Sequence, residues 1–159
     1  MLAYDAQGRA EFRAISLWCL MDTNTRSMVL PGKSGVMVEG TLRGNELAVP
    51  GSLAIKGLEH TRSRTVLYSN LDRNGHMNNT RYLEWISDLL PSAFHKDHTP
   101  REFTVCYHSE AMEGEPLDIH YEMKEEGLLQ VDAWRENDAA SGTHNRIFVA
   151  QVQYEADIL

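Results

Sequence analysis

Four side chains that can accept, donate or move protons lie close together in one polar turn of the sequence: Asp72, Asn74, His76 and Asn78. If this segment is extended, the alternate spacing of positions 72, 74 and 76 sends those three side chains to one side. The apolar spacing that follows is typical of a helix, whose first N–H groups carry a partial positive charge and face the turn. Proton-transfer groups beside an anion-stabilising helix end predict a place where an acyl group is hydrolysed.

The same turn carries a longer pattern, D-x-N-G-H-x-N-N-x-x-Y-x-x-W, over residues 72–85. This pattern resembles the active-site segment of the acyl–acyl carrier protein thioesterases, enzymes that release fatty acids from carrier protein. The Asn-Gly-His form is similar to the bacterial branch of the family. The resemblance implies fatty acyl–acyl carrier protein as substrate and partner, and no metal or other cofactor.

A second segment, Tyr107-His108-Ser109-Glu110-Ala111, matches a family motif at the end of a strand. The resemblance places Glu110 on the acidic position of the family. Many plant members carry a cysteine at the next position, where this chain has Ala111, and Cys106 lies four residues before Glu110. A cysteine nucleophile is therefore disfavoured, and attack by water is expected.

The resemblance implies a role for each catalytic residue. Glu110, with His76, is expected to be the general base that takes a proton from water, a function that contributes about 100- to 10,000-fold. Asn74 is expected to hold the thioester carbonyl or the water. Asp72 is expected to orient Asn74 or His76 and to fix the tautomer of the ring.

The residues between these positions are expected to bind the substrate. Gly75 lets the backbone approach the thioester closely, Met77 lines an acyl pocket beside the catalytic histidine, and Asn78 completes the set. Backbone N–H groups of residues 75–77, at the start of the helix, are expected to stabilise the oxyanion. The structural alternative is that residues 72–79 form only an Asx-rich turn and a helix cap.

Hydrophobic periodicity predicts the secondary structure. A helix over about 78–90 follows the motif, with Asn78 or Asn79 as its N-cap and Pro91 as its stop. One helix followed by a meander of long antiparallel strands is an α+β arrangement, and the resemblance implies the hotdog fold, in which the sheet wraps around the central helix. The strands are expected at residues 10–22, 27–30, 65–69, 101–109, 116–125, 128–136 and 143–155.

The resemblance also implies a domain organisation. Members of the family carry two tandem hotdog domains, and a segment like residues 16–23 closes the first of them. Residues 1–50 are therefore expected to be remnant strands of a first hotdog and a linker, with a short helix near 36–42. Residues 51–159 are expected to form a complete hotdog thioesterase domain. Hotdog domains usually pair sheet to sheet, so the resemblance implies a homodimer, and the open edges of the leftover strands favour further self-association.

The charge of the chain is unevenly distributed. The 159 residues carry 15 basic and 23 acidic side chains, a net charge of −8, and residues 102–159 contain 13 acidic against three basic. This acidic half argues against nucleic acid as a partner. Residues 60–101, with six basic against four acidic, are expected to steer an acidic carrier protein toward the motif.

The sequence also indicates the cellular compartment of the protein. It shows no signal peptide and no apolar run long enough to cross a bilayer, which predicts a cytoplasmic protein without a membrane partner. Cys19 and Cys106 lie in apolar runs and are expected to be reduced, buried thiols.

Two other functions stay open at this point. A hotdog hydrolase of acyl-CoA would use a basic patch to engage the nucleotide 3′-phosphate, and competition by free CoA would distinguish it. A non-catalytic acyl-binding module would bind the acyl group without turnover. The spacing of five further histidines shows neither the i, i+4 pairs nor the cysteine partners of a zinc site: they are His95, His98, His108, His120 and His144.

Overall fold

The computed structural model describes residues 2–22, 24–25, 27–35, 51–124, 127–135 and 145–157. The chain divides into two compact units, Met1–Gly51 and Ser52–Leu159. The short helix expected near 36–42 lies outside the described residues.

The first unit contains short strands that pair in twos. Residues 14–19 belong to no strand, so the single strand expected over residues 10–22 is wrong. Two-stranded ribbons offer little surface on which to bury side chains, and Phe12 and Trp18 are exposed. The elements are β1 (Leu2–Tyr4) paired with β2 (Ala10–Arg13), β3 (Leu20–Met21) paired with β4 (Met28–Val29), and α1 (Pro31–Ser34).

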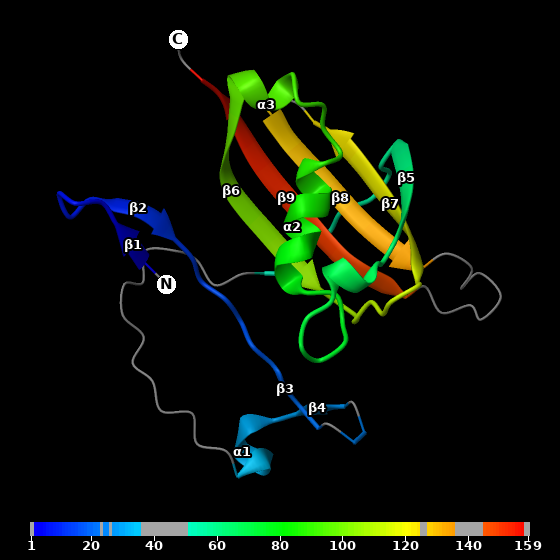
Figure 1. Cartoon of the computed structure of the whole chain (residues 1–159). Helices are drawn as coiled ribbons and strands as arrows, with labels where there is room; N and C mark the ends of the chain where they lie inside the picture. The colour runs from blue at the N-terminus through cyan, green and yellow to red at the C-terminus, as the bar shows by residue number, and fades with distance from the viewer. Residues whose placement is uncertain are drawn as a thin grey trace. The chain divides into compact units, whose positions relative to one another are not determined.

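The second unit is a five-stranded antiparallel sheet with a helix across one face (Figure 1). The strand order is β5-β7-β8-β9-β6, so β5 and β6 are the edges of the sheet and β8 is its centre. Each pair of neighbours is antiparallel. The strands are β5 (His60–Thr65), β6 (His98–Tyr107), β7 (Pro116–Met123), β8 (Leu128–Arg135) and β9 (Arg146–Ala156).

The strand before the motif lies earlier than expected. β5 ends at Thr65, and η1 (Tyr68–Asn70) is a 3-10 turn where the sequence predicted a strand over residues 65–69. The side chains of β5 are nearly all exposed, because it is an edge strand with the polar sequence HTRSRT. It therefore lacks the apolar alternation from which a half-buried strand is recognised. The four later strands are confirmed, with their ends shifted by a few residues.

The helix that follows the motif is α2 (Asn79–Ser87). Asn78 is its N-cap, and its side-chain oxygen accepts the Thr80 N–H at 2.9 Å, which confirms the predicted cap. The helix is shorter than the expected 78–90, because residues 88–90 already form turns before Pro91. A second short helix, α3 (Phe94–Asp97), leads directly into β6.

The core lies between α2 and the sheet. The helix contributes the buried side chains of Tyr82, Trp85 and Ile86. They join one cluster with inward-facing residues of the sheet, which include Leu117 and Phe148. Removal of this apolar surface from water is the main favourable term in folding, and it fixes α2, and thus the motif before it, against the sheet.

Two further expectations concern the burial of the cysteines and the presence of a membrane-spanning helix. Cys19 is exposed and Cys106 is half-buried, so the prediction that both thiols are buried is wrong. In the described parts of the chain, no helix is both long and apolar enough to cross a membrane.

Candidate active site

The polar turn before α2 is a tight loop closed by backbone hydrogen bonds. The Asp72 N–H donates to the His76 carbonyl at 2.8 Å, and the Gly75 N–H donates to the Asp72 carbonyl at 3.1 Å. The Asp72 carboxylate accepts the Asn74 N–H at 2.7 Å, which makes an Asx turn. Gly75 has a φ of +80°, a conformation that glycine adopts without a Cβ penalty.

This loop contradicts the extended conformation expected for residues 72–76. Because the chain reverses between Asp72 and His76, alternation cannot be the reason that their side chains share one side. The turn instead leaves Asn74 exposed, with Asp72 and His76 half-buried. Asp72 does bond to the backbone of Asn74, as the structural alternative expected, and its role in orienting the catalytic groups stays a prediction.

His76 and Glu110 are brought together from two distant segments of the chain. His76 Nε2 lies 3.4 Å from Glu110 Oε2. The His76 side chain is 19% exposed and that of Glu110 is 42% exposed, so the ring is sheltered while water reaches the carboxylate. Backbone contacts join the two segments, since the Met77 N–H donates to the Ala111 carbonyl at 2.8 Å and His76 forms a β-bridge with Met112.

The residues expected to bind substrate take part in packing and capping. Met77 is 3% exposed and belongs to the core. The Asn78 side-chain oxygen accepts both the N–H and the hydroxyl of Thr80, at 2.9 and 2.8 Å. Substrate contact by Gly75, Met77 and Asn78 stays a prediction. Ala111, at the position where plant relatives carry cysteine, is fully buried in the core.

Two of the three expected oxyanion donors are already engaged. The N–H of Gly75 donates to Asp72 and the N–H of Met77 donates to Ala111. These bonds close the loop and join it to the Glu110 segment, so breaking them to bind substrate would open the site. The N-terminal end of α2, with its partial positive charge, still adjoins the loop.

Two tyrosines pack beside the start of α2. The Tyr107 hydroxyl donates to the Asn79 carbonyl at 3.0 Å, and its ring lies 5.3 Å from that of Tyr82. Burial raises the pKa of the Tyr82 hydroxyl and of the Tyr107 hydroxyl. Both therefore stay protonated at neutral pH and act as hydrogen-bonding groups, not as bases.

Two charged residues that no sequence motif indicated, Arg135 and Glu115, contact the backbone of residues 110–112. Arg135, at the end of β8, donates from Nη2 to the Glu110 carbonyl, and its Nε lies 3.2 Å from Glu115 Oε2. Glu115 Oε2 also accepts the Met112 N–H at 3.0 Å. No motif contains these residues, and Arg135 comes from a strand far along the chain, so no local signal could have found it.

A second histidine–carboxylate pair lies on β7 and β8, where it joins the two neighbouring strands. His120 Nδ1 is 3.1 Å from Asp132 Oδ1, and Arg146 Nη2 is 3.5 Å from Asp132 Oδ2. Asp132 is 6% exposed, so its buried carboxylate is satisfied by the hydrogen bond with His120 and by the nearby guanidinium of Arg146. Among the residues that the structure describes, no three His, Cys, Asp or Glu side chains gather in a way that could hold a metal ion.

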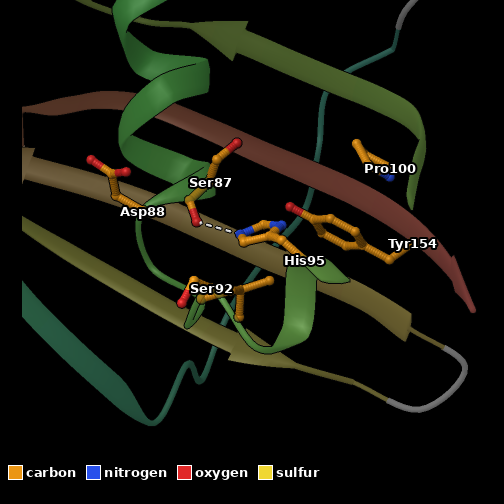
Figure 2. A pocket seen from close by; sticks show the side chains of 7 residues that line it. Ser87, Asp88, Ser92, His95, Pro100 and Tyr154 are labelled. Carbon is orange, nitrogen blue, oxygen red and sulfur yellow. Dashed lines mark hydrogen bonds between the residues drawn. The ribbon is translucent and has the colours of Figure 1, made fainter. Parts of the chain in front are cut away.

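A hollow of about 380 Å³ lies at the other end of α2 (Figure 2). His95 extends into it, with Nε2 3.0 Å from the Ser87 carbonyl oxygen, and the Tyr154 ring lies beside the His95 ring. At 1.5 Å per residue, the length of α2 separates this hollow from the His76 loop by roughly 12 Å. The hollow is lined by Ser87, Asp88, Leu90, Ser92, His95, Pro100 and Tyr154.

Comparison with known protein families assigns most of the chain to one family. Residues 56–156 match the family model for the acyl-ACP thioesterase C-terminal domain. The chain belongs to this family. The matched residues include the whole His76 loop, α2 and the Glu110 segment, so the resemblance expected from the sequence is confirmed. No curated protein matches the chain in a sequence search.

Solved structures of thioesterases share the fold. An acyl-ACP thioesterase from Bacteroides thetaiotaomicron is 23% identical, with a TM-score of 0.67 over 85% of this chain and 53% of that one. A Lactobacillus plantarum protein assigned as an oleoyl thioesterase is 22% identical, with a TM-score of 0.66 over 99% of this chain and 62% of that one. A 12:0-ACP thioesterase from Umbellularia californica is 18% identical, with a TM-score of 0.63 over 86% and 53%.

These similarities confirm the predicted α+β hotdog fold. The chain spans between 53% and 62% of the length of those three thioesterases.

Proposed function

We propose that this member of the acyl-ACP thioesterase C-terminal domain family hydrolyses the thioester of fatty acyl–acyl carrier protein to the free fatty acid, with water as the nucleophile. The approach of His76 Nε2 to Glu110 Oε2, at 3.4 Å beside the start of α2, carries the proposal. The family match supports a thioester as the substrate.

In this mechanism the Glu110 carboxylate and the His76 ring act on one water molecule. The pair takes a proton from the water, whose oxygen attacks the thioester carbonyl carbon to form a tetrahedral intermediate. The carbon–sulfur bond then breaks, and the proton passes to the leaving sulfur of the carrier protein. The exposure of Glu110 supports this role, because water must reach its carboxylate.

Asn74 is the donor that we assign to the thioester carbonyl. Its side chain is exposed in the loop, and its amide is neutral, so it can approach a carbonyl without the desolvation cost of a charge. The adjoining positive end of α2 favours the negative charge that develops on the carbonyl oxygen. One such donor contributes about 3–4 kcal/mol to the transition state.

The burial of Ala111 supports water as the nucleophile. Its side chain lies in the core and is fully buried, so position 111 does not face the solvent that Glu110 contacts. Cys106 lies on β6 and not at this position.

Arg73 is the residue that we assign to carrier-protein docking. Several other basic residues of the region are engaged in ion pairs, for example Arg64 with Asp88 at 2.9 Å and Arg81 with Glu84 at 2.6 Å. Arg73 is exposed within the active-site loop itself. A positive charge there would attract an acidic carrier protein to the position at which its acyl group must enter.

The direct test is hydrolysis of a panel of acyl–acyl carrier protein thioesters by the chain, with Glu110→Gln as the inactive control. We expect turnover by the wild type and a loss of about 100-fold or more in the variant. Arg73→Glu should raise KM for the carrier-protein substrate while leaving KM for an acyl-CoA unchanged. Preference for acyl-CoA, with inhibition by free CoA, would overturn the carrier-protein assignment, and acyl binding without turnover would overturn hydrolysis.

A further inference from the structure

The segment that carries Glu110 comprises residues 108–115. It is held by charged side chains outside the active-site motifs. It connects β6 to β7 and contains no helix or long strand of its own. A general base on such a connection needs other contacts to keep its carboxylate near the histidine. The contacts made by Arg135 and Glu115 supply that restraint.

Arg135 contacts two points of this segment with one side chain. Its Nη2 donates to the Glu110 carbonyl and its Nε lies 3.2 Å from Glu115 Oε2. The guanidinium is planar and presents its donors in a fixed fork, so the two acceptors cannot move independently of each other. Because Arg135 is the last residue of β8, the central strand of the sheet, and pairs with Leu117 on β7, the fork is anchored to the paired strands.

Glu115 connects Arg135 to the middle of the segment. The same Oε2 atom that faces Arg135 accepts the Met112 N–H at 3.0 Å. Met112 in turn forms the β-bridge with His76. One carboxylate therefore links the arginine to the backbone that runs beside the catalytic histidine.

We propose that Arg135 and Glu115 are positioning residues that set the 3.4 Å approach of Glu110 to His76. The proposal rests on the proposed function of that pair. The side chains of Arg135 and Glu115 are 26% and 29% exposed, so solvent weakens their interaction less than it does in a fully exposed pair. A displacement of about 1 Å at a reacting group can cost about 100-fold in rate, so a loosened segment should affect the chemical step.

The matched control is an arginine–glutamate pair at the far end of the same sheet. Arg101 on β6 lies 3.0 Å from Glu155 on β9, with 55% and 62% of the two side chains exposed. Like the Arg135 pair it is an Nε-to-carboxylate contact made by a strand residue, but it lies at the opposite end of β9 from the Glu110 segment. Arg101→Gln therefore reports the cost of losing a more exposed pair of the same type away from the site.

The experiment compares Arg135→Gln, Arg135→Lys and Arg101→Gln in the full chain. We expect Arg135→Gln to lower kcat about 10- to 100-fold with little change in KM, because the acyl group still binds while the base is misplaced. Arg135→Lys should recover only part of kcat, since an ammonium group lacks the fork. Arg101→Gln should leave kcat near the wild-type value, because a charge that only steers the carrier protein acts on KM and not on the chemical step.

Amide hydrogen exchange of the same variants gives a readout that does not depend on turnover. Arg135→Gln should speed exchange at Met112 and Met77 while the amides of β8 and β9 stay protected. A fall in kcat that only follows a loss of folded protein, with exchange faster throughout, would overturn a positioning role. So would unchanged kcat, or unchanged exchange at Met112. A folded wild-type chain without turnover would instead contradict the proposed function, and exchange at Met112 would still decide whether the restraint exists.

Discussion

The two ends of α2 carry similar side chains and differ in how these are paired. At the N-terminal end, the His76 ring lies 3.4 Å from the Glu110 carboxylate. At the C-terminal end, His95 lies 3.0 Å from the carbonyl oxygen of Ser87. An imidazole and a carboxylate can exchange a proton near neutral pH, whereas a peptide carbonyl accepts a hydrogen bond without taking the proton.

The carboxylate at the C-terminal end has a different partner. Asp88 Oδ2 accepts a hydrogen bond from Arg64 at 2.9 Å, so its charge is directed toward β5 and not toward His95. The polarity of the helix adds to the contrast, since its N-terminal end favours negative charge and its C-terminal end favours positive charge. A histidine, an acid and a hollow at one helix end are therefore not sufficient for a hydrolytic site, because the acid must face the histidine.

The largest expected effect comes from removing one histidine from each end. His76→Ala should lower kcat for an acyl–acyl carrier protein by about 100- to 10,000-fold, because it removes a partner in proton transfer. His95→Ala should keep kcat near the wild-type value. Steady-state hydrolysis by both variants, after circular dichroism has shown that they fold, makes the comparison. An equal loss in the two variants would show that the ends are not distinct in function.

A core substitution on α2 should destabilise the second unit as a whole. Ile86 has no exposed surface, so Ile86→Ala should lower the free energy of unfolding by about 2–5 kcal/mol through lost burial and the cavity left behind. Urea unfolding measures this loss. Glu84→Gln, on the exposed side of the same helix, is the control and should change stability by less than about 0.5 kcal/mol. Similar losses in the two variants would contradict the packing of α2 against the sheet.

The caps of α2 should differ in their contribution to stability. Asn78→Ala should cost about 1 kcal/mol, because its side chain accepts the Thr80 N–H at the first turn. Asp88→Ala, at the C-cap, should cost less, because the Asp88 carboxylate makes only a partly exposed ion pair there. Chemical denaturation of both variants gives the two values. A larger loss for Asp88→Ala would reverse the expected order.

The smallest effect concerns pH. Burial raises the pKa of the Tyr154 hydroxyl above its usual value near 10, so the unfolded state loses this proton first. The stability linked to this group is present in full below about pH 10 and falls as pH rises further, by at most about 1.4 kcal/mol per pH unit. Thermal unfolding between pH 8 and 11 should show a weaker pH dependence for Tyr154→Phe than for the wild type. An identical dependence would contradict the burial of that hydroxyl.

The sequence predicted the parts of the fold that have strong local patterns. The strands β7 and β9 alternate apolar and polar side chains and were located closely, and the cap at Asn78 has a recognisable residue type. β5 was missed because an exposed edge strand needs no apolar face. The division of residues 10–22 into two strands was missed because the run is rich in β-forming residues, while pairing partners decide where a strand ends.

The candidate site was predictable in composition but not in geometry. The family resemblance named both His76 and Glu110, and the structure places them 3.4 Å apart. The loop conformation depends on the Asx turn at Asp72 and the positive φ of Gly75, which alternation alone does not reveal. Arg135 could not be predicted, since its contact with the Glu110 segment exists only after β8 has paired within the sheet.

The strand order of the sheet also has a consequence for biosynthesis. β9, the last strand, pairs with both β8 and β6, and the ladder joins His98 to Ala156 and Tyr107 to Phe148. Contacts between residues so far apart in sequence form slowly, because a long loop must close first. During synthesis β6 therefore emerges well before β9. Until β9 pairs with it, the backbone hydrogen-bonding groups of β6 are unpaired and can bind other chains. The emergence of β9 is the event that completes the sheet, because β9 joins β6 to β8, and a chain that ends before Arg146 would expose two unpaired strand edges.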